Sequence, residues 1–160
     1  MSTPPRADPA IYRRLRDHML QLKQPGFGPG AVQKVLMDWH VDNGTVTVLA
    51  AADGTGSLYF SSGGGFLGGG QGYPEVREAA RHAVGLAERL MPQFRKTDSI
   101  ELPARGSASF FVTTNEGIYT VVAKEADLRN GLGPFAALGN AMQAIITGYR
   151  LRQQKAPTKN

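Results

Sequence analysis

The sequence predicts an α+β domain in which a central antiparallel sheet of five to six strands, arranged as two meanders, is packed on one face by three helices. Segments with apolar residues at helical spacing alternate with groups of short segments rich in β-branched and aromatic residues. Turn sequences rich in Asn, Asp and Gly separate neighbouring strands. The expected order is helix, meander, helix, meander, helix.

The three helices are expected over residues 9–23, from Pro74 to about Pro92, and from about Pro134 onward, because proline favours the first turn of a helix and ends a preceding one. The first helix has an expected apolar face of Ile11, Leu15, Met19 and Leu22. The expected faces of the others are Val76, Ala79, Ala80, Ala83, Leu86, Ala87, Leu90 and Met91, and Phe135, Leu138, Met142, Ile145, Ile146 and Tyr149.

The first meander is expected over residues 32–41, 45–50 and 57–60, and the second over 100–102, 108–113 and 118–123. Asp42-Asn43-Gly44 and Asn115-Glu116-Gly117 are strong hairpin turns within these groups.

Chain length and composition favour one domain. At 160 residues and 17.2 kDa the chain can bury a core without disulfides, and its lack of cysteine excludes thiol catalysis and thiolate metal sites. We expect a mobile leader over residues 1–8, a single domain over 9–153 and a mobile tail over 154–160. No signal-peptide or membrane-spanning pattern is visible in the sequence, so a cytoplasmic location is expected and a membrane partner is not.

The net charge of +5 raises the question of an anionic partner. Much of the positive excess lies near the two ends of the chain, which is typical of solvated charge rather than of a binding stripe. These residues are Arg13, Arg14, Arg16, Arg150, Arg152, Lys155 and Lys159. Nucleic-acid binding is therefore kept only as a minor alternative.

A glycine-rich stretch over residues 63–72 follows an expected strand and precedes the second helix. Its candidate contact residues are Gly63, Gly64, Gly65, Phe66, Leu67, Gly68, Gly69 and Gly70. The spacing matches a dinucleotide fingerprint literally, but the helix begins too late and the sheet is expected to be antiparallel; no Gly-Lys-Ser/Thr follows, which excludes a P-loop. The stretch is interpreted as a flexible loop or a close sheet-to-helix packing, with ligand or partner binding as the alternative. Within that alternative, Phe66 and Leu67 favour a protein contact.

Other candidate sites carry weaker signals. The three histidines lie in different elements without metal-ligand spacing, so neither a metal site nor a cofactor is expected, and no catalytic residue is identified. Asp38, His40 and Asp42 alternate onto one face of a strand and could form a small polar cluster. Arg77 and Arg81 share part of the second helix and could form a basic surface patch, with a solvated face as the alternative interpretation.

The second half of the chain carries a resemblance to a known family. Ser109-Phe110-Phe111-Val112, the strand from Gly117 to Val122, the connection from Asn130 to Gly133 and the helix beginning Pro134-Phe135 are similar to the last strands and final helix of the roadblock/dynein light chain family and its profilin-like relatives. The similarity spans roughly residues 9–152. The sequence departs from the family pattern in two ways: the strand over 32–41 is extra, and the stretch over 63–72 is longer than the usual strand-to-helix turn.

That resemblance implies a non-catalytic scaffold that dimerises and docks a small Ras-like GTPase or a signalling partner. We therefore expect a protein-interaction domain, homodimeric and without a cofactor. The alternative from a different functional class is a small-molecule sensor that uses the loop over residues 63–72.

Overall fold

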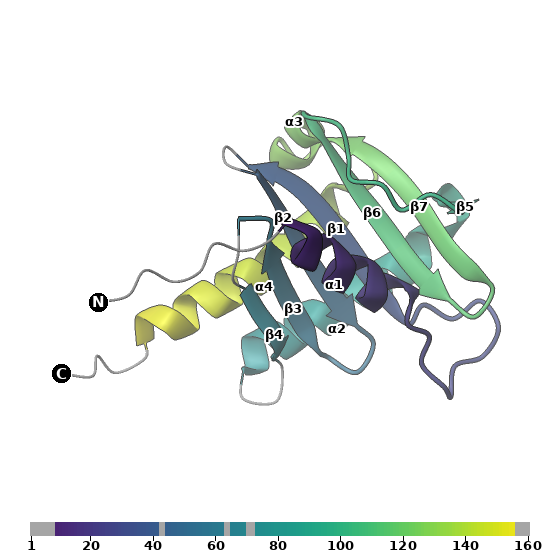
Figure 1. Cartoon of the computed structure of the whole chain (residues 1–160), viewed down its shortest axis with the longest axis horizontal. Coiled ribbons are helices and arrows are strands. Elements are labelled where there is room, and N and C mark those ends of the chain that lie inside the picture. The colour runs from purple at the N-terminus through teal and green to yellow at the C-terminus, as the bar shows by residue number, and fades with distance from the viewer. Residues whose placement is uncertain (1–8, 42–43, 63–64, 70–72, 156–160) are drawn as a thin grey trace.

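The computed structural model describes residues 9–41, 44–62, 65–69 and 73–155 (Figure 1). The expected leader and the end of the expected tail lie outside these residues. The elements, in chain order, are α1 (Pro9–Gln21), β1 (Lys34–Val41), β2 (Gly44–Ala51), β3 (Gly56–Phe60), β4 (Gly65–Gly69), α2 (Pro74–Leu90), the 3-10 turn η1 (Met91–Gln93), β5 (Arg95–Thr97), β6 (Ser107–Thr114), β7 (Gly117–Lys124), α3 (Glu125–Arg129) and α4 (Ala136–Lys155).

The strands form one sheet of seven in the order β4-β3-β2-β1-β6-β7-β5, and every pair of neighbours is antiparallel. The predicted α+β class and antiparallel sheet are confirmed. The sheet is wider than predicted because β4 and β5 join it at its two edges. The predicted strand over residues 100–102 is wrong, since these residues lie in the connection between β5 and β6.

The second group of strands is not a simple meander. β5 pairs with β7, whereas β6 pairs with β1 and β7, so the chain leaves the outer edge of the sheet and returns across β7 to begin β6. In Figure 1 the connection over residues 98–106 passes in front of β6 and β7. Ile100 and Leu102 in this connection pack against buried apolar residues of the sheet, which is why they are apolar without being in a strand.

Helices cover both faces of the sheet, which corrects the expectation of a single covered face. α2 and α4 lie behind the sheet in Figure 1 and α1 lies in front of it. Because side chains alternate along a strand, β1 directs Val35 and Met37 into the core under α2 and α4, and Leu36 into the core under α1. The predicted apolar faces of the second and third helices belong to the first of these cores.

The buried face of α1 differs from the predicted one by about one residue. Tyr12, Arg16 and Leu20 are buried, whereas Ile11 is 60% exposed and Leu22 is 43% exposed. Hydrophobic periodicity alone would not place an arginine toward a sheet. The sheet instead provides polar partners for α1, so the helix turns a mixed polar and apolar face toward it.

Candidate interaction surfaces and the polar cluster under α1

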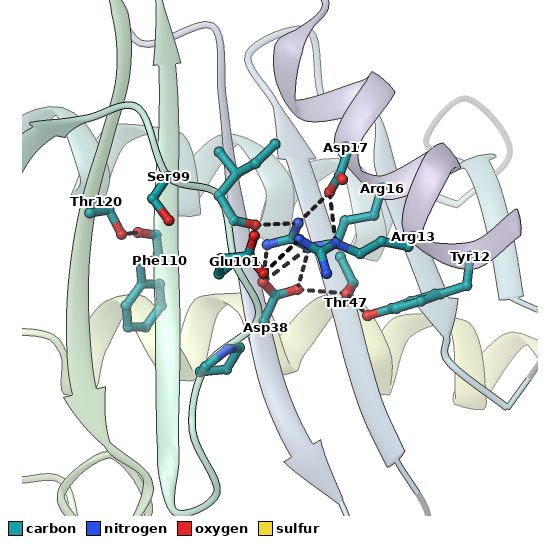
Figure 2. Close-up of polar contacts among 12 residues, drawn as sticks. Tyr12, Arg13, Arg16, Asp17, Asp38, Thr47, Ser99, Glu101, Phe110 and Thr120 are labelled. Atoms are coloured by element: carbon teal, nitrogen blue, oxygen red, sulfur yellow. Dashed lines mark hydrogen bonds and ion pairs between the residues drawn. The ribbon is translucent and has the colours of Figure 1, made fainter. Parts of the chain in front are cut away.

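A buried ion pair joins α1 to β1. Arg16 Nη2 lies 2.6 Å from Asp38 Oδ2, and Arg16 Nε lies 3.1 Å from both oxygens of Asp38. Both side chains are fully buried. Arg16 Nη1 also donates to the Ile100 carbonyl at 2.7 Å and to Asp17 Oδ1 at 2.5 Å (Figure 2). Nε, Nη1 and Nη2 of the guanidinium therefore each have at least one hydrogen-bond acceptor.

The cluster continues to a neighbouring strand. Thr47 Oγ1 donates to Asp38 Oδ1 at 2.7 Å, and the Tyr12 hydroxyl lies 2.5 Å from Thr47 Oγ1 (Figure 2). Burial raises the pKa of Tyr12 to about 12, although the hydrogen bond with Thr47 opposes part of that rise. For Arg16, burial acts to lower the pKa, but the hydrogen bonds and charges of Asp38 and Asp17 outweigh it and the pKa is raised. Arg16 is therefore charged at neutral pH.

This cluster fixes a helix and gives a substrate no route of entry. Acid-base chemistry requires the reacting group to reach the proton it moves. Neither Arg16 nor Asp38 has any exposed side-chain surface, and no buried side-chain nitrogen or oxygen in the described residues lacks a hydrogen-bond partner. The arrangement anchors α1 at one position on the sheet.

Two further residues of the sheet hold the end of α1. Lys34 Nζ donates to the carbonyls of Met19 and Leu22 at 2.5 Å each, and Thr113 Oγ1 donates to the Leu20 carbonyl at 2.6 Å. These are carbonyls of the last helical turn, which have no partner within the helix itself. Burial lowers the pKa of Lys34. Nothing in the sequence indicates that the side chain of Lys34, in a strand, faces the end of a helix.

The glycine stretch is partly a strand. Gly65, Phe66, Leu67, Gly68 and Gly69 form β4, which pairs with β3 through Leu58–Phe66 and Tyr59–Gly65. The expectation of a loop is therefore wrong for residues 65–69. The remaining candidates in the stretch, Gly63, Gly64 and Gly70, lie outside the described residues.

Arg77 and Arg81 do lie together, over the turn between β2 and β3. A Cβ on Gly54, whose φ is +94°, would lie 2.5 Å from Arg77 Cγ and 3.3 Å from Arg81 Nε. The stem of Arg77 and the guanidinium of Arg81 therefore lie against this turn. Neither forms an ion pair within the part of the chain that is described, so their charges remain available to solvent or to a partner.

The predicted cluster of Asp38, His40 and Asp42 does not form among the described residues. Asp38 bonds to Arg16 and Thr47, whereas His40 Nε2 lies 2.6 Å from the Pro103 carbonyl, and Asp42 is not described. No group of three or more His, Cys, Asp or Glu within the described ranges could hold a metal ion.

Two shallow pockets flank α3, and sequence reasoning found neither. The first, of about 240 Å³, is lined by Trp39, Leu128, Arg129, Gly139, Asn140 and Gln143. The second, of about 270 Å³, lies against the end of β7 and is lined by Val122, Ala123, Lys124, Asp127, Leu128, Leu132, Gly133, Pro134 and Phe135. Their residues come from strands and helices far apart in the sequence, which is why no local pattern marks them.

No family model, curated protein or solved structure matches this chain. Among the described helices, none combines the length and apolar character needed to cross a bilayer.

Proposed function

We propose that this chain is a non-enzymatic protein-interaction domain that acts as a homodimer, with β4 of one copy pairing with β4 of the other. The observation that carries the proposal is the position of β4 at the end of the sheet, where its only strand neighbour among the described residues is β3. An edge strand presents a row of backbone N–H and C=O groups that a second strand can pair with.

The composition of β4 supports self-pairing. Natural sheet edges are commonly protected by lysine or proline, and the sequence of β4, Gly-Phe-Leu-Gly-Gly, contains neither and has no charge. Two copies would therefore meet without electrostatic repulsion. The opposite edge differs, because β5 carries Arg95 and Lys96, both exposed, and two such edges would oppose like charges.

The enclosed polar cluster supports a role without catalysis. The charged pair in the sheet interior, Arg16 and Asp38, is used to hold α1 and has no exposed side-chain surface. The α+β order, with helices flanking two groups of strands, also supports the resemblance to the roadblock/dynein light chain family. On that resemblance, a cytoplasmic small Ras-like GTPase or signalling protein is the proposed partner class.

Size-exclusion chromatography with light scattering tests the dimer on the full chain at micromolar concentration. The expected mass is twice 17.2 kDa. A mass of one chain across the concentration range would overturn the homodimer.

A small-molecule sensor is the second candidate, and the pocket beside Trp39 is the observation that favours it. An aromatic ring, Arg129, Asn140 and Gln143 line this pocket, which combines apolar surface with convergent polar groups. Trp39 is the only tryptophan of the chain, so its fluorescence reports directly on occupancy. A screen of nucleotides and metabolites by thermal shift tests the idea, since a ligand at 100 times its dissociation constant adds about 2.7 kcal/mol of stability.

A further inference from the structure

Besides the edge at β4, the sheet has an open edge along the part of β7 that β5 does not reach. β5 pairs only with Ile118, Tyr119 and Thr120 of β7, through Thr97, Lys96 and Arg95 respectively. β7 continues to Lys124, and over residues 121–124 its only strand neighbour in the described part of the chain is β6. The second half of β7 is therefore a sheet edge, although β5 is the outermost strand beside its first half.

The register of β6 and β7 identifies which backbone groups face this edge. The Glu125 N–H donates to the Gly106 carbonyl, so the hydrogen-bonded pairs with β6 fall on Glu125 and on alternate residues before it, Ala123 and Val121. Val122 consequently directs its N–H and C=O away from β6. No backbone hydrogen bond in the described parts of the chain engages them.

An apolar surface adjoins these groups. Val122 is 53% exposed and Leu132 is 57% exposed, and both line the pocket of about 270 Å³, with Phe135 and Pro134. Phe135 itself is fixed, because its ring packs against Phe94 and Phe110 with centroids 5.9 and 6.1 Å away. The pocket is therefore a preformed depression beside an unpaired backbone.

Positive charge surrounds the edge at both ends. Arg95 pairs with Thr120, and side chains alternate along β7, so Arg95, Val122 and Lys124 share one face of the sheet. Arg95, Lys96 and Lys124 are exposed and form no ion pair within the described residues. Of the nearby carboxylates, Glu125 pairs with Arg129 and accepts from the His40 N–H, which leaves Asp127 in the pocket.

From these observations we infer that the edge of β7 at residues 121–124 binds an extended acidic segment of a partner protein by strand addition. The backbone of the segment pairs with Val122, an apolar side chain enters the pocket beside Leu132 and Phe135, and carboxylates meet Arg95, Lys96 and Lys124. The Val122 edge offers both a backbone donor and a backbone acceptor, which suits a peptide backbone, whereas a phosphate chain offers acceptors only. A second copy of this edge is disfavoured because it would bring the same cations together.

This inference rests on the proposed role as an interaction domain but uses the edge opposite to β4, so binding and dimerisation can be measured separately. The probe is a fluorescein-labelled hexapeptide of alternating glutamate and valine, titrated with the full chain and followed by fluorescence anisotropy. We expect saturable binding that weakens as salt is raised from about 50 mM to about 500 mM. The matching lysine-valine peptide should not bind.

Charge-reversing variants locate the site. Lys124→Glu and Arg95→Glu should each weaken binding by about tenfold, whereas Arg81→Glu, which reverses an exposed charge over the β2–β3 turn, should leave it unchanged. Val122→Pro removes the outward N–H and should abolish binding. Since Val122→Pro could also unfold β7, hydrogen exchange on the unmodified chain provides a second readout: the Val122 amide should become protected when the peptide is present.

Three results would overturn the inference: no binding of the glutamate-valine peptide by folded protein, binding that Lys124→Glu and Arg95→Glu leave unchanged, or no added protection at Val122. Tighter binding of a labelled oligothymidylate, weakened by the same two variants, would assign the surface to single-stranded nucleic acid instead. A monomer in light scattering would refute the β4 dimer and leave these results standing.

Discussion

Arg16 of α1 and Asp38 of β1 form an ion pair that is completely enclosed, with Nη2 and Oδ2 2.6 Å apart and neither side chain exposed. The guanidinium also lies 5.3 Å from the centre of the Phe111 ring. Two buried charges are tolerated when each is paired and hydrogen-bonded, as here. This pair fixes where a short helix sits on the sheet, together with the hydrogen bonds of Tyr12, Lys34 and Thr113 and the apolar contacts around them.

Replacing Asp38 with alanine should be strongly destabilising. The change leaves Arg16 buried without its partner, and breaking such a pair from one side costs about 3–5 kcal/mol. Urea unfolding followed by circular dichroism measures the loss. An effect below about 1 kcal/mol, the range of exposed ion pairs, would show that the pair is not enclosed in solution.

The double variant Arg16→Met with Asp38→Leu separates charge from packing. With both charges removed, no buried charge is left without a partner, although the Ile100 carbonyl and the Thr47 hydroxyl each lose a hydrogen bond, so most of the stability lost in Asp38→Ala should return. The same unfolding experiment applies. Stability as low as that of Asp38→Ala would mean that the ion pair itself, and not the orphaned arginine, carries the effect.

Stability should fall as the pH rises from about 10 to about 12 because of Tyr12. Its pKa is raised to about 12 in the folded state, against an ordinary value of 10.0, so the folded chain holds a proton that the unfolded chain has lost within this window. A shift of this size corresponds to about 3 kcal/mol. Burial also raises the pKa of Tyr59 and lowers that of Lys34, and these groups titrate in both proteins when wild type is compared with Tyr12→Phe. The free energy of unfolding of wild type minus that of Tyr12→Phe should become smaller between about pH 10 and pH 12. A difference that stays constant over this range would contradict the raised pKa of Tyr12.

Gly56 in β3 should not tolerate alanine. A Cβ there would lie 2.7 Å from Val76 Cγ1 and 3.2 Å from Ile145 Cγ2, and overpacking of this kind costs about 1–3 kcal/mol. Gly85 in α2 is the matched control, since a Cβ there meets nothing within 4 Å. Gly85→Ala should stabilise the helix by about 0.5–1 kcal/mol. Thermal unfolding of both variants should shift in opposite directions.

Leu67→Lys tests the proposed pairing of β4. A lysine in an edge strand opposes pairing with a second copy, because two added charges meet across the interface. We expect the variant to have the mass of one chain in light scattering. Leu151→Lys, which adds the same charge at a leucine 41% exposed on α4, should remain dimeric. Dimers of both variants would place the interface elsewhere.

Local patterns predicted the helices that pack on one large core. α2 and α4 begin close to Pro74 and Pro134 as expected, and their apolar faces lie in the core beneath them. Hairpin-turn sequences predicted the antiparallel pairing of β1 with β2 and of β6 with β7. In each case the signal and the element lie in the same short stretch of chain.

Prediction failed where a residue depends on a distant partner. Local pattern predicts Arg16 to be a solvated charge, because the sequence does not show that Asp38 lies opposite it. β5 is only three residues long and is defined by its pairing with β7. The glycines of β4 predict a loop, because glycine has little strand propensity of its own. The pocket beside Val122 likewise joins β7 to residues beyond α3.

Local sequence patterns are enough to predict an α+β chain with amphipathic helices and antiparallel hairpins, because periodicity and turn chemistry act between near neighbours. The packing of α1 on the second face of the sheet and the burial of its arginine follow from long-range contacts. So do the positions of β4 and the end of β7 at edges of the described sheet. Those outcomes depend on which strands become neighbours, and strand neighbours here are separated by up to scores of residues whose pairing no local pattern encodes.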